Sequence, residues 1–138
     1  MSAFSDYYEN KIIDHMLRGQ AFTVPTTVYV ACFTANTNLE SNNPSAEVST
    51  SGTAYSRQAI TLSAASAGAT TNSADLTWST ATANWGTVTS VAIVDHATNT
   101  TWGTNVNVLM WADLAASKVV NNGDTFKILA GDFDVTVA

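Results

Sequence analysis

The chain has 138 residues, of which 46 are Thr, Ser or Asn and only 16 are Asp, Glu, Lys or Arg. Soluble domains carry roughly 25% charged residues, whereas this chain carries 12%, and its net charge of −6 excludes an electrostatic surface for nucleic acid or an anionic membrane. Cys32 is the only cysteine, which excludes an internal disulfide. This length and composition predict one domain, residues 1–138, that serves as a structural or binding module.

The first predicted element is an amphipathic helix over about residues 3–18, within an N-terminal segment 1–19. Apolar residues at i, i+4 spacing, with Ile13 and Leu17 beside them, form one stripe along it: Phe4, Tyr8, Ile12 and Met16. Ser2 or Ser5 is placed to cap its start and Gly19 to end it. Such a stripe packs either on the chain's own sheet or on a neighbouring subunit, and the sequence leaves both alternatives open.

Residues 20–138 are predicted to form short strands joined by turns. The predicted strands cover residues 27–34, 55–62, 74–80, 87–95, 106–111, 118–120, 125–130 and 133–137. About eight strands at this spacing favour an antiparallel sandwich or jelly roll, so the expected fold is mainly β with one N-terminal α-helix. Residues 27–34 are apolar in both alternating rows, which predicts a strand that is covered on both faces.

Two polar connections interrupt this pattern. Residues 36–53 contain the turn signal Asn42-Asn43-Pro44 and exceed the length of a normal connection, which predicts a functional loop or an extended arm. Residues 63–73 consist almost entirely of small residues and predict a flexible loop. Residues 121–124 contain an Asn-Gly pair, which is typical of a hairpin turn.

No pattern in the sequence predicts catalysis. His15 lies in the expected helix and His96 at a strand end, and no Gly-x-Ser-x-Gly elbow presents a serine nucleophile. Cys32 lies within an apolar strand, where a thiol acts as a small hydrophobic side chain. P-loop, EF-hand and dinucleotide-binding glycine patterns are absent from the sequence. We therefore expect no enzymatic activity and no cofactor or metal.

Two further groups of residues have alternative interpretations. Asp132 and Asp134 alternate along a predicted strand and have the spacing to grip Ca²⁺ or act as an acid/base pair, but we favour a role in keeping an edge strand soluble. Among the four Trp residues, Trp102 in the turn 98–105 is the best candidate for an exposed contact with a host glycan or protein. Packing in the core is the alternative for each Trp.

Several segments along the chain form a recognisable set: Phe4-Ser5-Asp6-Tyr7, Tyr29-Val30-Ala31-Cys32-Phe33-Thr34, Ala83-Asn84-Trp85-Gly86 and Val120-Asn121-Asn122-Gly123-Asp124. In these segments the chain resembles a family of small virion proteins of tailed bacteriophages, often labelled tail-fibre proteins. The resemblance extends to cement (decoration) proteins, which bind the outside of an icosahedral capsid. It implies a jelly-roll-like β fold and a structural role in the virion.

The expected function is a non-enzymatic capsid cement protein, assembled in the host bacterial cytoplasm and bound to the capsid exterior. Its expected partners are the major capsid protein and further copies of itself, as a homodimer or homotrimer, with no nucleic acid and no membrane. A tail-fibre or tail-tip adhesion module that recognises a host surface is the alternative. The residues expected at the contact surface are Phe4, Tyr8, Ile12, Met16, Asn42, Asn43 and Trp102.

Overall fold

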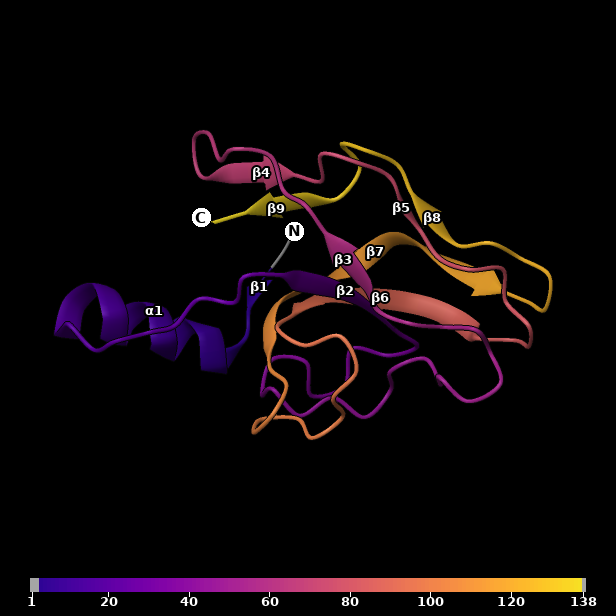
Figure 1. Cartoon of the computed structure of the whole chain (residues 1–138), viewed down its shortest axis with the longest axis horizontal. Helices are drawn as coiled ribbons and strands as arrows, with labels where there is room; N and C mark the ends of the chain where they lie inside the picture. Colours follow the sequence, from indigo (N-terminus) through magenta and orange to yellow (C-terminus); the bar gives the residue numbers. More distant parts are fainter. Residues whose placement is uncertain (1–2, 138) are drawn as a thin grey trace.

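A computed structural model of the chain describes residues 3–137 and shows a mainly β fold with one helix near the N-terminus (Figure 1). In chain order the elements are β1 (Ala3–Phe4), α1 (Asp6–Arg18), β2 (Val28–Phe33), β3 (Gln58–Ile60), β4 (Ala69–Thr71), β5 (Leu76–Thr77), β6 (Gly86–Val94), β7 (Val108–Val120), β8 (Lys127–Ile128) and β9 (Asp134–Thr136). The fold class predicted from the sequence is confirmed.

The strands form two layers. Five of them make one antiparallel sheet in the order β1-β7-β6-β2-β3. Two antiparallel ribbons, β4–β9 and β5–β8, lie above this sheet in the view of Figure 1. The arrangement is consistent with a β sandwich, in which the long β6–β7 hairpin is the central element.

Strand β2 is covered on both faces, as its two apolar rows predict. Val30 and Cys32 belong to the core between the sheet and the two ribbons. Ala31 and Phe33 belong to a second core on the opposite face of the sheet. Leu39, from the connection after β2, is fully buried in this second core, so loop residues close the face that no strand covers.

The strands predicted at residues 106–111 and 118–120 are one continuous strand, β7. Val88 pairs with Lys118 and Ser90 pairs with Asp113, so residues 114–117 of β7 lie opposite Thr89 alone. A bulge of this kind adds residues to one strand without ending it. The Ala-rich stretch 112–117 between the two predicted strands suggested a break that the backbone does not make.

Two connections also differ from the sequence predictions. Residues 36–53 are not an extended arm, because Thr34 and Val48 donate backbone hydrogen bonds to Ala46 and Cys32 (both 2.9 Å) and hold the segment against β2. Residues 63–73 contain β4, which pairs with β9, so the predicted flexible loop is partly a strand. In both places backbone pairing with distant residues overrides a polar composition that is typical of mobile loops.

Candidate functional site: interaction surfaces

The root of α1 is anchored firmly in the domain. Ser5 is fully buried and caps the helix, since its hydroxyl accepts a hydrogen bond from the backbone N–H of Tyr8 (3.3 Å) and donates one to the carbonyl of Val108. Its backbone N–H also donates to the carbonyl of Leu109 (3.1 Å). The helix begins at Asp6 rather than near residue 3, because β1 pairs with β7 first.

The predicted apolar stripe of α1 divides into two parts. At about 100° per residue, each i, i+4 step rotates the side chain by roughly 40° around the helix, so a stripe at strict i+4 spacing turns away from the domain. Phe4 and Tyr8 pack edge to face with ring centroids 5.5 Å apart, and Tyr8 also contacts Phe22 at 6.0 Å. Ile12 is half-buried, whereas Met16 is 71% exposed.

The outer half of α1 presents an apolar surface to solvent. Ile13 is 51% exposed and Leu17 is 80% exposed, and with Met16 they form what we call the α1 tip. Figure 1 shows the helix extending away from the two layers, and among the named elements it contacts only β1 and β7. The sequence places Ile13 and Leu17 beside the i, i+4 stripe, and the structure shows that these two residues and Met16 form its exposed end.

The loops at one end of the sandwich are tied together by the buried guanidinium of Arg57. It forms an ion pair with Glu47 in which Nε and Nη2 donate to the two carboxylate oxygens, both at 2.7 Å. Its Nη1 donates to the carbonyls of His96 (2.8 Å) and Asn99 (2.9 Å), and the ring of Trp102 lies 4.8 Å from the guanidinium carbon. This arrangement, which the sequence did not predict, joins the connection between β2 and β3 to the connection between β6 and β7.

The predicted contact residues outside α1 are distributed differently. Trp102 is half-buried and packs on Phe33 and Arg57, so most of its ring is used inside the domain. Asn42 is buried, and its side chain bonds the N–H of Val108 (2.7 Å) and the side chain of Asn107 (2.9 Å). Of these three residues, only Asn43 is exposed to solvent.

Cys32, the cysteine considered for catalysis, is buried beside side chains that have structural roles. Burial raises the pKa of the Cys32 thiol well above its usual value, and the nearby carboxylate of Glu47 raises it further. Burial likewise raises the pKa of Tyr55, whose hydroxyl accepts from the N–H of Cys32 (2.8 Å) and bonds Glu47 (3.1 Å). A protonated thiol in this position is a poor nucleophile.

Within residues 3–137, no three His, Cys, Asp or Glu side chains are grouped so that they could hold a metal ion. The described part of the chain also contains no helix of the length and apolarity needed to span a membrane.

One protein family matches this chain over almost its whole length. The family model is described as podophage GP4 fiber I protein gp80, and it matches residues 3–136. A search of curated proteins found no match. The match covers the projecting helix, the sheet and both ribbons, so it applies to all the surfaces described above.

Proposed function

The chain belongs to the podophage GP4 fiber I protein gp80 family of tailed-phage virion proteins, and from this membership we propose that it is a fibre component that contacts its neighbours in the virion through the α1 tip. The exposure of the tip carries this proposal. Fully burying one Leu, Ile or Met side chain contributes ~1.5–3 kcal/mol. Burial of the three exposed tip residues against a partner would therefore contribute substantially to the free energy of binding.

The anchored root makes the helix suitable for this role. Because Ser5 is held by β7 and by the helix itself, the tip is presented at a fixed position instead of on a flexible tether. A rigid docking element loses less conformational entropy on binding. We include self-association, as a dimer or trimer, in this proposal, since symmetric copies would present several tips to a fibre or its base at once.

Copy number and position test the proposal directly. Virions that carry this protein are purified, its copies are counted against the major capsid protein by quantitative mass spectrometry, and it is located with a labelled antibody. A few dozen copies or fewer on the tail support a fibre component. Hundreds of copies spread over the head would contradict it.

The second candidate is the capsid cement protein expected from the sequence. It is favoured by one observation, namely that residues 3–137 form a compact sandwich in which no repeated shaft segment is present. In that role the tip would contact the major capsid protein across a seam on the capsid exterior. The same count separates the two candidates, because cement proteins cover the whole shell.

A further inference from the structure

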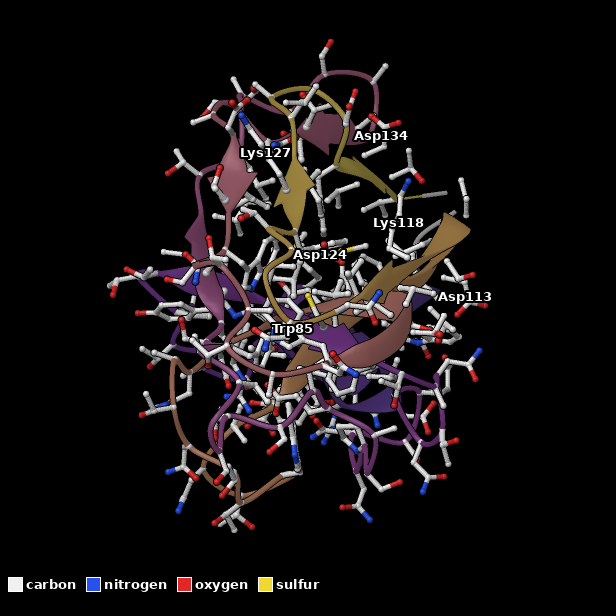
Figure 2. All side chains as sticks on the ribbon, turned by 90° about the vertical axis from the view of Figure 1, so that its right-hand side faces the viewer. Trp85, Asp113, Lys118, Asp124, Lys127 and Asp134 are labelled. Atoms are coloured by element: carbon white, nitrogen blue, oxygen red, sulfur yellow. The ribbon has the colours of Figure 1, made fainter. Side chains whose placement is uncertain are left out.

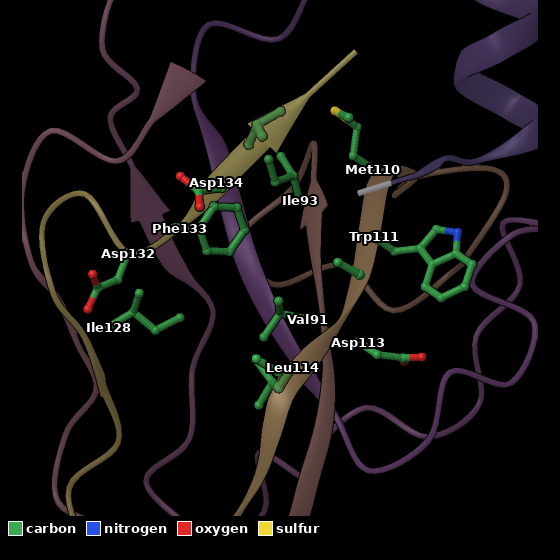
Figure 3. Close-up of a pocket in the computed structure, with 13 residues that line it drawn as sticks. Val91, Ile93, Met110, Trp111, Asp113, Leu114, Ile128, Asp132, Phe133 and Asp134 are labelled. Carbon is green, nitrogen blue, oxygen red and sulfur yellow. The ribbon is translucent and has the colours of Figure 1, made fainter. Parts of the chain in front are cut away.

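An apolar groove of about 260 Å³ lies beside the outer edge of β7. Figure 3 shows Val91, Ile93, Met110 and Leu114 on the sheet side, with Phe133 and other residues of the C-terminal segment across from them. Half-buried apolar residues line the open part of the groove: Ala112, Leu114, Ile128 and Phe133. Side chains of this kind, arranged in two facing rows, suit the apolar side chains of an inserted segment.

The sheet side of the groove is a strand edge without a neighbour. β1 pairs with β7 only at Trp111 and Met110, and beyond Trp111 the described residues place no strand on this side of β7. The carbonyl of Leu109 already accepts a hydrogen bond on this side, from the N–H of Ser5. Backbone groups alternate between the two edges of a strand, so those of Asp113 point to the open edge. An open edge is a template for a further strand.

The charges at the groove are all negative. Three carboxylates line it, from Asp113, Asp132 and Asp134, and no Lys or Arg does. Asp113 points away from Leu114 in Figure 3, and its carboxylate accepts hydrogen bonds from Asn36 (3.2 and 3.3 Å) and Ser90 (2.7 Å). It contributes negative charge to the opposite face of any added strand. Figure 2 shows Asp113 and Asp134 on the same side of the molecule. The groove thus combines apolar contacts on one face of an added strand with carboxylates around it.

We propose that this groove binds an extended polypeptide segment of a partner protein, which adds to β7 as a strand and alternates apolar with basic residues. The main-chain bonds to β7 provide affinity, and the alternating side chains provide specificity. The apolar residues of the partner segment enter the groove beside Phe133. Its basic residues lie near Asp113 and near the rim of the groove, which Asp132 and Asp134 form. This inference is independent of the α1 tip and of the proposed fibre role.

A synthetic peptide of about eight residues, a common strand length, in which Lys and Val alternate, tests this proposal on the purified full chain. Binding is followed by amide chemical shifts and by hydrogen exchange. We expect saturable binding and slower exchange of outer-edge amides in residues 112–119. A Glu-Val peptide should bind roughly tenfold more weakly, or ~1.4 kcal/mol, and a peptide with its Lys and Val in separate blocks should give no protection.

Three outcomes would overturn the proposal. They are equal binding of the Lys-Val and Glu-Val peptides, binding without protection of the edge amides, and the absence of saturable binding. Edge-amide shifts that depend on the concentration of the chain without any peptide would identify a second copy as the occupant, which also contradicts the proposal.

Two variants connect the binding to the groove. Asp132→Lys with Asp134→Lys reverses the rim charge at exposed positions and should invert the preference between the two peptides. The matched control, Asp6→Lys with Glu9→Lys, makes the same net change on α1 and should leave the preference intact. Ala115→Trp places a large ring at the exposed edge of the groove and should weaken binding of the Lys-Val peptide without changing the net charge of the chain. An equal effect of the control pair would show that overall charge, not the groove, attracts the peptide.

Discussion

The loop end around Arg57 and the α1 tip use their side chains in opposite ways. At the loop end the charged side chain of Arg57 is buried, and its hydrogen bonds go to Glu47 and to two loop carbonyls within the domain. At the tip, apolar groups such as Leu17 lie in solvent. In these two regions a buried charged residue stabilises the domain and apolar side chains are exposed to solvent, which is the reverse of the usual distribution. We therefore expect partners to bind at the exposed apolar surface of the α1 tip and not at the polar loops around Arg57.

Arg57→Ala tests the loop-end half of this comparison with the largest expected effect. It leaves Glu47 and two loop carbonyls without their donor, and breaking a buried ion pair costs about 3–5 kcal/mol. We expect the free energy of unfolding to fall by about that amount in urea denaturation. The control is Arg18→Ala, which removes the exposed pair with Asp14 and should change stability by less than ~0.5 kcal/mol. Similar small losses in both variants would show that the loops do not depend on Arg57.

The neighbouring asparagines Asn42 and Asn43 give a closely matched test. Asn42→Ala leaves the buried N–H of Val108 unpaired, which costs about 1–3 kcal/mol, and places Ala at a positive φ of 58°. Asn43 is exposed, so Asn43→Ala should stay within about 0.5 kcal/mol of the unchanged chain. Urea denaturation of both variants measures the difference. A larger loss for Asn43→Ala would contradict the internal role of Asn42.

These asparagines also show what a sequence can and cannot predict here. Local signals succeeded: Gly19, with a positive φ of 66°, ends α1 as its position suggests, and the two apolar rows of β2 predict burial on both faces. The turn signal Asn42-Asn43-Pro44 predicts a turn, but not which amide faces inward. That choice depends on Val108, which is 66 residues away in sequence. A polar composition is equally compatible with a loop whose side-chain amides face solvent and with one whose amides pair with buried backbone groups.

The candidate surfaces were predictable to a similar degree. A periodic stripe identified α1 as a contact element, yet its strict i, i+4 form grouped Phe4, which packs internally, with Met16, which does not. The Arg57 ion pair and the groove beside β7 join residues that are far apart in sequence and in different elements. No local pattern encodes such neighbours, because register and loop packing bring them together.

The pH dependence of stability tests the buried groups that adjoin Glu47, with a smaller expected effect. Burial raises the folded-state pKa of Cys32 and Tyr55 above their usual values of 9.0 and 10.0. The folded chain then retains protons that the unfolded chain releases, so this contribution is complete below about pH 9 and is lost as the pH rises through and beyond these values. We expect urea midpoints to fall progressively as the pH rises above about 9.

Tyr55→Phe separates the two groups. It removes the hydroxyl that bonds Cys32 and Glu47, so stability should be lower at neutral pH. Its midpoint should then decline less steeply above about pH 10, since the thiol is the only member of this buried pair that still titrates. An equally steep decline in Tyr55→Phe would mean that other groups cause the alkaline loss.

The smallest expected effect on stability belongs to the α1 tip, and it is the most informative about function. Met16→Lys with Leu17→Lys changes two largely exposed side chains to a good helix former whose charge suits the end of a helix, so the free energy of unfolding should stay within about 0.5 kcal/mol per change. Incorporation into virions, measured by quantitative mass spectrometry, should nevertheless fall sharply, because a charge in an apolar contact must be desolvated. Deleting residues 1–19 would not separate these effects, since it also removes the buried Ser5 anchor.

Phe4→Ala supplies the matched control from β1, the short strand that directly precedes the helix. Phe4 contacts Tyr8 within the domain, so its loss should lower stability, while a variant that still folds keeps the tip and should still be incorporated. If Met16→Lys with Leu17→Lys were incorporated at the normal copy number, the tip would have no partner in the virion, and its exposure would have to be explained without one. If it also lost stability, the tip would contact the domain and the contrast with the loop end would fail.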